Sequence, residues 1–443
     1  MKPGLVIKLR PSGPWRIGPD SGARNRVDTI YHSDSLYGAV ASAMVRLGRF
    51  DEWLEATVRE DAPAVCFSSC FPFLDEVGLV VPPRTIWPPK TTSAASGRVR
   101  WKSARFVPLE VVRAILAGEA LKEDDWTVDG PSECLIPAGR PGPFRTGVRW
   151  NAAVDRLTGA SERHATGCIE FRAGAGLWTI AGFRDDEAYA RWQDPVKAAF
   201  RLLADTGFGG ERSRGWGRAE QPEFVEGSLP EMILPVVEQA AGESGDQGPG
   251  AEGQGSEMVA EIPKPEPDPE PPKPEPDPVP PPPPDSVPGP EPPEPVPPVT
   301  VPDPEPNPDV VPAPPLEPVT AEAPVVEAEA PLAPAPEVPL EAPLVMEPPE
   351  ANALWLLSLF TPAAADAVDW RRGNYTLLAR GGRVDSPAGS GELKKLVNMV
   401  VEGSVLYAEG DPHGAAPDVA PEGFSHPVFR AGFALAIPLP KVS

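Results

Sequence analysis

The run from Gly207 to Arg218, GFGGERSRGWGR, contains residues that could bind a polyanion. Its twelve residues include five glycines, three arginines and one tryptophan. Glycine lets the backbone adopt positive φ and approach a ligand closely, while planar guanidinium groups can bind phosphate oxygens or stack on bases. An ordinary flexible turn would explain the glycines but not the interleaved arginines. The run therefore predicts a contact with an RNA or DNA backbone.

Further basic residues lie in two other stretches. The segment FRTGVRWNAAVDRLTGASER carries Arg145, Arg149, Arg156 and Arg163, and residues 84–113 contain seven basic side chains and one acidic one. Such arginines commonly contact backbone phosphates, although any single one could equally be a solvated loop residue. Together they predict a basic face that a nucleic acid could use.

The net charge of −24 is concentrated in one segment. Residues 241–350 hold 24 acidic side chains against only Lys264 and Lys273, so the remainder of the chain is almost neutral. The same segment contains more than half of the 65 prolines and shows no sustained apolar period. We expect a disordered, extended linker there, with a docking site for proline-reading modules as the alternative. The acidity therefore does not argue against nucleic-acid binding elsewhere.

Four residues with metal-ligating side chains occur as two pairs. Cys66 and Cys70 are four positions apart, as are His164 and Cys168, and together they could provide a tetrahedral zinc set. The long gap between the pairs makes this signal weak. The four cysteines are also too scattered for a disulfide framework. We expect reduced, mostly buried cysteines and neither a metal nor a cofactor.

Residues suited to acid–base catalysis are few. Histidine is the usual general base near neutral pH, and the chain has His32, His164, His413 and His426. His32 precedes a predicted helix and could be a base, but nothing in the sequence puts a lysine or tyrosine beside it. No GGDD-type metal-binding doublet, HD pair, Walker loop or nucleophile elbow occurs. We therefore expect a protein that is not an enzyme.

The elements that would position these residues begin with a strand and a helix. The alternating apolar residues of GLVIKLR predict a strand with one buried face. HSDSLYGAVASAMVRLG predicts a helix that Ser33 or Asp34 caps and Gly48 ends. DPVKAAFRLLADTG predicts a second helix that stops at Gly207, and GCIEFRA with GLWTIAGF predicts a hairpin.

The linker divides the chain into three predicted parts. Residues 1–225 would form an N-terminal lobe with the glycine-rich loop, residues 226–350 the linker, and residues 351–443 a C-terminal lobe. No secretory signal and no apolar run of about 20 residues is seen. We expect a cytoplasmic protein without membrane contact.

Four motifs give the sequence a resemblance to the RAMP proteins of CRISPR effector complexes. They are HSDSLYGA at 32–39, NAAVDRLTGASE at 151–162, the glycine-rich run, and the C-terminal series LLSLF, RGGRVDS, KKLVNMVVEGS and HPVFRAGFALAIPL. Both lobes resemble the subunit that binds the crRNA 5′ handle in the type III-A Csm complex. The proline-rich insert departs from that family, in which we expect a short connection.

The resemblance implies an α+β fold with two ferredoxin-like (RRM-type) lobes separated by the disordered proline-rich insert. It implies a subunit that holds the crRNA 5′ handle and bridges the large polymerase-type subunit and a backbone RAMP subunit in antiviral defence, with no small-molecule substrate. Trp87, Trp101, Phe106, Trp150 and Trp216 suit base stacking, although we expect Trp150 and Trp178 to belong to the core. The residues expected to contact RNA are Ser33, Ser35, Arg84, Lys90, Lys102, Arg105, Arg145, Arg149, Arg156, Arg163, Gly209, Gly210, Arg212, Ser213, Arg214, Gly215, Trp216 and Gly217.

Two other functions remain open. One is a RAMP-family endoribonuclease that processes precursor crRNA, which would make a cleavage product from repeat RNA. The other is a pure assembly scaffold, which would bind the large subunit but no RNA.

Overall fold

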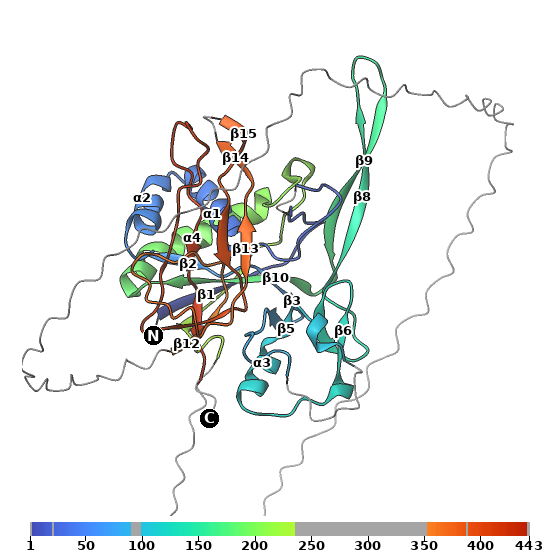
Figure 1. The fold of residues 1–443 in the computed structure, drawn as a ribbon. Coiled ribbons are helices and arrows are strands. Elements are labelled where there is room, and N and C mark those ends of the chain that lie inside the picture. Colours follow the sequence, from blue (N-terminus) through green and yellow to red (C-terminus); the bar gives the residue numbers. More distant parts are fainter. Residues whose placement is uncertain (1, 20–21, 90–98, 235–351, 387–388, 441–443) are drawn as a thin grey trace, which may run out of the picture. The chain divides into compact units, whose positions relative to one another are not determined.

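The computed structural model describes residues 2–19, 22–89, 99–234, 352–386 and 389–440 (Figure 1). The described residues on both sides of 235–351 belong to one compact unit with mixed α/β structure and antiparallel sheets. The insert predicted at 226–350 lies almost entirely outside the described residues. Residues 226–234 are described, and they complete the last strand of the N-terminal part and a turn after it.

The N-terminal part, residues 2–234, alternates strands and helices. Its strands are β1 (Lys2–Leu9), β2 (Val65–Phe67), β3 (Phe71–Leu74), β4 (Val77–Val80), β5 (Val107–Pro108), β6 (Trp126–Asp129), β7 (Cys134–Pro137), β8 (Phe144–Val154), β9 (Ser161–Phe171), β10 (Ala175–Phe183) and β11 (Glu223–Leu229). Its helices are α1 (Ser33–Arg46), α2 (Phe50–Leu54), α3 (Leu109–Leu116) and α4 (Asp186–Thr206), with short π or 3₁₀ turns η1 (Glu55–Arg59), η2 (Trp101–Ser103), η3 (Glu123–Asp125) and η4 (Arg212–Arg214).

The C-terminal part, residues 352–440, consists of strands and loops. The strands are β12 (Asn352–Leu356), β13 (Leu377–Arg380), β14 (Arg383–Ser386), β15 (Gly389–Leu393), β16 (Val397–Val400), β17 (Val405–Ala408), β18 (Gly414–Ala415), β19 (Gly432–Phe433) and β20 (Ala436–Pro438). None of its described residues is helical. The second ferredoxin-like lobe expected from the resemblance is therefore not found there, because short sheets of two or three strands replace the strand–helix alternation.

The central sheet has the strand order β11-β1-β10-β3-β4-β5, with β2 also paired to β10. Leu5, Ile7 and Leu9 of β1 are fully buried, which confirms the predicted strand with one apolar face. Helices α1 and α4 pack against each other and connect strands of this sheet (Figure 1). The glycine-rich loop lies between α4 and β11, so helix α4 and the central sheet fix its two ends.

The ends of helices α4 and α1 differ in how they are stabilised. Helix α4 starts with Asp185 accepting a hydrogen bond from Ala188 N at 2.8 Å and stops at Gly207, where φ is 79°. Helix α1 begins at Ser33, with His32 at the cap position, and no side chain caps it. The prediction of a cap at Ser33 or Asp34 is wrong because both side chains bond to the C-terminal part instead.

The predicted hairpin pairs differently from expectation. GCIEFRA lies in β9 and GLWTIAGF forms β10, but β9 pairs with the preceding β8 and β10 joins the central sheet. The β8–β9 hairpin is closed by a turn in which Asp155 accepts hydrogen bonds from Leu157 N at 2.9 Å and Thr158 Oγ1 at 2.7 Å, and Gly159 has φ of 71°. The hairpin extends away from the central sheet (Figure 1).

One apolar core joins the two parts of the chain. Trp355 Nε1 donates to Val81 O at 3.1 Å, and Ser69 N donates to Leu357 O at 2.9 Å. The ring of Phe433 lies edge-on to Tyr37 of α1, with centroids 5.5 Å apart. Buried C-terminal residues thus complete the core of the N-terminal part.

Candidate nucleic-acid interface

A cleft of about 750 Å³ opens between α1, the loop after α4 and the C-terminal segment 380–394. Six arginine or lysine side chains and one carboxylate line it, together with His32, counting the residues that the structure describes. The basic residues are Arg46, Arg212, Arg380, Arg383, Lys394 and Arg430, and the acid is Asp34. This excess of positive charge suits a polyanionic ligand.

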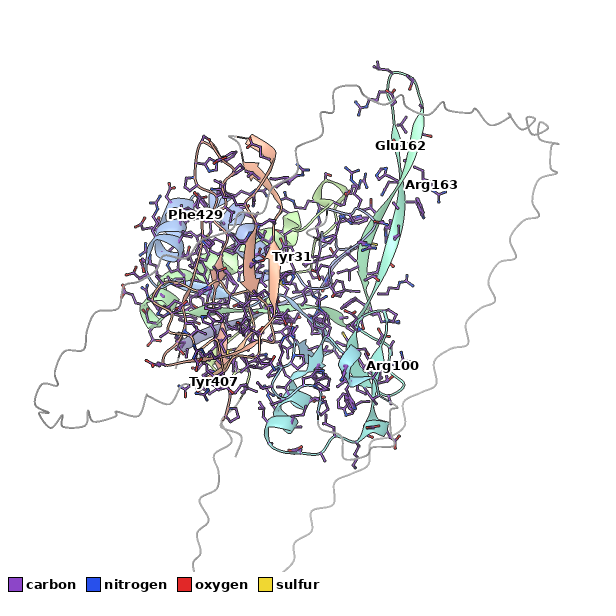
Figure 2. All side chains as sticks on the ribbon, viewed as in Figure 1. Tyr31, Arg100, Glu162, Arg163, Tyr407 and Phe429 are labelled. Atoms are coloured by element: carbon purple, nitrogen blue, oxygen red, sulfur yellow. The ribbon has the colours of Figure 1, made fainter. Side chains whose placement is uncertain are left out.

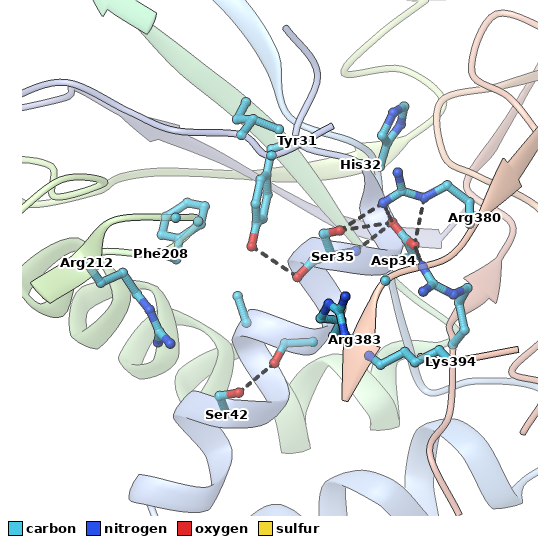
Figure 3. Close-up of a pocket in the computed structure, with 18 of the residues that line it drawn as sticks. Tyr31, His32, Asp34, Ser35, Ser42, Phe208, Arg212, Arg380, Arg383 and Lys394 are labelled. Atoms are coloured by element: carbon cyan, nitrogen blue, oxygen red, sulfur yellow. Dashed lines mark hydrogen bonds and ion pairs between the residues drawn. The ribbon is translucent and has the colours of Figure 1, made fainter. Parts of the chain in front are cut away.

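The basic side chains reach the cleft from opposite sides of α1 (Figure 3). Arg212 comes from the glycine-rich loop, whereas Arg383 and Lys394 come from the C-terminal part. The Arg383 guanidinium donates to the backbone oxygen of Gly391. Arg46 and Arg212 are exposed and form no ion pair with another described residue. A ligand in the cleft would therefore meet charges from both parts of the chain.

Asp34 is the centre of a buried ion-pair network at the wall of this cleft. Its Oδ1 lies 3.0 Å from Arg380 Nη2, its Oδ2 lies 3.1 Å from Arg380 Nε, and Arg430 also pairs with Oδ2. Less than a tenth of each of the three side chains is exposed. Burial would raise the pKa of Asp34, but the two guanidinium groups hold it below its ordinary value. Two arginines and one carboxylate leave a net positive wall.

His32 lies between two carboxylates, where the N-terminal and C-terminal parts of the chain meet. Its Nδ1 lies 2.8 Å from Glu402 Oε1 and its Nε2 lies 3.3 Å from Asp28 Oδ2. Burial alone would lower the pKa of His32, but Glu402 and Asp28 raise it to about 9. An imidazolium at neutral pH has no lone pair with which to accept a proton. His32 therefore joins the two parts of the chain and is poorly placed as a general base.

The serines of the HSDS segment have different surroundings. Ser33 is buried, and its Oγ accepts a hydrogen bond from Leu359 N at 2.9 Å. Ser35 lines the cleft, where Arg380 Nη2 donates to its Oγ at 3.1 Å. Of the two predicted RNA contacts, Ser35 is the one that a ligand could reach.

Close packing within the protein explains the glycines of the glycine-rich loop. A Cβ on Gly209 would lie 2.6 Å from Arg16 O, and a Cβ on Gly217 would lie 2.1 Å from Phe208 O. Both residues have positive φ, 88° and 78°. The sequence predicts that these glycines let the backbone approach a ligand. In the structure, they let the loop pack closely against Arg16 and Phe208 of the protein itself.

The remaining residues of this loop divide into two groups. Gly209, Gly210 and Arg212 line the cleft. Beyond them, Ser213 and Arg214 are exposed in the η4 turn, Arg214 Nη1 lies 3.0 Å from Glu211 Oε2, and a Cβ on Gly215 would meet open space. Trp216 is only 7% exposed, so its ring serves packing and is not available to stack on a base.

None of the predicted arginines of the β8–β9 hairpin lines the cleft, and Figure 2 shows Arg163 on the hairpin well apart from Tyr31, which does line it. Arg145 and Arg149 both pair with Glu170, at 2.8 and 2.9 Å. Arg156 is exposed in the turn, and Arg163 lies over the ring of Trp150 at 4.1 Å from its centroid. The hairpin therefore presents a second basic surface.

Both Trp150 and Trp178 were expected in the core, which is wrong for Trp150 and confirmed for Trp178. Trp150 is 60% exposed and does not belong to the core, because the outer half of β8 pairs only with β9 and no other element covers it. Trp178 is buried, and its Nε1 donates to Leu79 O at 2.8 Å.

The other predicted contacts do not line the cleft. Arg84 and Lys102 are exposed, Lys90 lies outside the described residues, and Arg105 Nη1 donates to Thr29 Oγ1 at 2.7 Å. The aromatic residues nearby are mostly core: Trp101 and Phe106 are buried, and Trp87 packs edge-on against Trp101. Base stacking by Trp101 or Phe106 is not available in this arrangement.

The metal-ligating residues of the sequence are not brought together. No group of three or more His, Cys, Asp or Glu side chains suited to a metal occurs among the described residues, and the four cysteines are free thiols. Across the same residues, no helix has both the length and the apolar character needed to cross a membrane.

Sequence reasoning missed the five cleft residues Arg46, Arg380, Arg383, Lys394 and Arg430. The paired arginines of RGGR and the lysines of KKLV are visible in the sequence. What the sequence does not show is that Arg380 and Arg430 return to Asp34, more than three hundred residues away.

The comparisons with known proteins agree with this fold. Residues 349–439 match the family model described as the CRISPR Csm4 C-terminal domain. The structure of a Csm3–Csm4 subcomplex from the type III-A CRISPR-Cas interference complex is similar, with a TM-score of 0.50 and 12% identity over 98% of this chain and 99% of that chain. A Csm1–Csm4 cassette in complex with cA4 matches with a TM-score of 0.44 and 14% identity over 99% of this chain and 98% of that chain. No curated protein sequence matches significantly. Residues 349–439 are thus similar to the C-terminal domain of Csm4 proteins, and the fold of the chain is similar to that found in the Csm3–Csm4 subcomplex of a type III-A CRISPR-Cas system.

Proposed function

We propose that this chain is a non-catalytic subunit of a type III-A interference complex in antiviral defence, and that its basic cleft holds the 5′ handle of the crRNA. The observation that carries the proposal is the cleft between α1, the glycine-rich loop and segment 380–394, with six basic residues and one carboxylate. The single carboxylate, Asp34, is already paired with two arginines and would not repel a phosphate strongly.

Single-stranded RNA is recognised through its phosphates and its splayed bases. Arg212 and Arg383 supply exposed positive charge on either side of the cleft. Phe429, which is half-buried at the cleft wall, offers a ring on which a base could stack. In the N-terminal part, β1, α1, β3, β10, α4 and β11 follow in this order along the chain, and their strands lie in the order β11-β1-β10-β3 in the sheet. This arrangement supports a ferredoxin-like lobe of the kind found in RNA-binding proteins.

The partners follow from the family. We propose that the chain bridges a large polymerase-type subunit and a backbone RAMP subunit, since solved Csm4 chains are described in a Csm1–Csm4 cassette and in a Csm3–Csm4 subcomplex. The handle RNA would then lie where these two neighbours meet. The same assembly supports a cytoplasmic location, where the guide RNA is made.

A binding assay with repeat-derived RNA tests the proposal. The full chain is titrated against the labelled RNA over a salt series, and the same samples are run on a denaturing gel to look for cleavage. An Arg212→Ala/Arg383→Ala variant should bind more weakly and lower the slope of log affinity against log salt by about 1.4, or about 0.7 per lost phosphate contact.

A matched variant controls for the loss of two charges. Arg59→Ala/Arg191→Ala removes two exposed arginines that do not line the cleft, so its affinity and salt slope should stay close to those of the parent. Equal loss in both double variants would show that the cleft is not the binding site. A cleavage product would favour the endoribonuclease, and assembly without any RNA binding would favour the pure scaffold.

A further inference from the structure

We infer that Glu170 is an internal counterion that occupies a phosphate-binding pocket at the base of the β8–β9 hairpin and is displaced there by a phosphodiester of single-stranded RNA. The pocket has a volume of about 580 Å³ and shares no lining residue with the cleft. The inference rests on the proposed RNA-binding function and deepens it, because it assigns a second contact and a residue that controls it.

The geometry places two guanidinium groups on one carboxylate. Arg145 donates from Nε and Nη2 to Glu170 Oε2 at 3.1 and 2.8 Å, and Arg149 donates from Nε and Nη2 to Oε1 at 3.3 and 2.9 Å. Each arginine thus uses its Nε–Nη2 edge to bind Glu170. The carboxylate presents two oxygens to two arginines, as a phosphate group would.

The two arginines converge because of the strand register. Arg145 is directly opposite Glu170 in the β8–β9 pair, and Arg149 is four residues further along the same face. The residue between them on that face is Gly147, opposite Cys168, which leaves space for Arg149 to reach back toward Glu170.

The pocket retains positive charge beyond the pairs. Arg172 also lines it, is exposed, and forms no ion pair with the part of the chain that the structure describes. The hydrogen bonds from Arg149 and Arg145 lower the pKa of Glu170, so it is ionised at neutral pH. Three arginines against one carboxylate leave a net charge that attracts an anion even while Glu170 is in place.

The ion pairs are exposed enough for a ligand to replace the carboxylate. Arg145 and Arg149 have 69% and 50% of their side chains exposed, and Glu170 has 28%. Pairs at such exposure contribute little free energy and exchange readily. Arg149 is also positioned from its other side, because its guanidinium lies 5.9 Å from the ring centroid of Trp216 in the glycine-rich loop. The pocket is therefore linked through Arg149 to the glycine-rich loop, of which Gly209, Gly210 and Arg212 line the cleft.

A counterion of this kind makes binding more selective. An RNA phosphate must compete with Glu170 before it gains both arginines, so a strand that fails to fill the cleft as well is held weakly. Without the Glu170 charge, the pocket would accept any single-stranded polyanion.

The experiment compares Glu170→Gln with Glu162→Gln in the full chain. Both substitutions remove one negative charge from β9, and residues 162 and 170 lie on the same face of the strand, but Glu162 has no arginine ion pair among the described residues. A fluorescein-labelled oligouridylate is the probe, and a thermal melt accompanies each variant. Glu170→Gln should bind the probe about 2- to 5-fold more tightly at low salt and steepen the salt slope by about 0.7. Glu162→Gln should stay near the parent.

The Arg145→Ala background separates the pocket from general charge effects. In that background Glu170→Gln should strengthen binding less than in the parent, because one of the two arginines it releases is gone. Equal effects of the two glutamine variants, or the same gain with and without Arg145, would overturn the inference while leaving RNA binding intact. A parent chain that binds neither the oligouridylate nor repeat RNA would instead overturn the proposed function.

Discussion

The buried cation of His32 predicts that the protein loses stability as the pH rises from about 6.5 to about 9. The ordinary pKa of histidine is near 6.5, and in the folded chain Glu402 and Asp28 raise it to about 9 against the opposing effect of burial. A raised pKa contributes stability that is complete below the unfolded value and is lost as the pH passes the folded one. At about 1.4 kcal/mol per pKa unit, the loss amounts to about 3 kcal/mol.

The measurement is the free energy of unfolding of the full chain in urea, at several pH values between 6 and 9.5. Unfolded cysteines also ionise in this range, and burial raises the pKa of Cys66 to about 11, so part of any decline comes from thiols. Glu402→Gln serves as the matched variant because it leaves all cysteines unchanged but removes the carboxylate that does most to raise the pKa of His32.

We expect a smaller decline in Glu402→Gln than in the parent, together with lower stability at pH 6.5. The decline of the variant should begin near the same pH but end at lower pH, since Asp28 alone would hold the imidazolium less firmly. Identical pH profiles for the parent and the variant would refute the assignment of His32 as a cation between two carboxylates.

Three further outcomes are expected. Gly217→Val should lower the melting temperature by several degrees, because its Cβ would lie 2.1 Å from Phe208 O at positive φ; an unchanged melt would contradict this. Replacing residues 241–350 with a short glycine–serine connection should leave assembly and RNA binding largely intact and raise non-specific binding at low salt, as measured by co-purification and titration, and loss of assembly would count against it. A fragment of residues 354–443 should be poorly soluble or weakly folded alone, because Trp355 and Phe433 pack into the N-terminal core, whereas a cooperative unfolding transition of the monomeric fragment would oppose that view.

Local signals in the sequence were enough to predict several elements. The alternation in residues 4–10 gave β1, and a glycine with positive φ ends α4 at Gly207 as expected. These features depend on neighbours in the sequence, where apolar period and helix-ending glycines operate. The partner of β9 depends on a turn at Asp155 and Gly159 that competes with the turn before β10, and alternation alone does not decide between them.

The site could be predicted only in part, for a physical reason. Arg212 was found because its loop is rich in glycine and arginine within a few residues. Arg380 and Arg430 could not be assigned, because their position depends on a buried contact with Asp34 that spans most of the chain. Trp216 and Phe106 were expected to meet RNA because arginines surround them in sequence, yet aromatic rings beside charged residues can still turn into the core.

The shared core sets a delay during synthesis of the chain. Leu435 and Ile437 follow β11 by about 200 residues, yet both are buried in the core that includes β1. At translation rates of about 5 to 20 residues per second, the ribosome needs about 10 to 40 s to make the roughly 200 residues between β11 and Leu435. During that time, the apolar surface that Trp355 and Leu435 later cover is exposed to solvent, and His32 lacks its ion pair with Glu402. A nascent chain in that state is a natural client for chaperones that shield apolar surface, and shortening the acidic segment would shorten the exposure.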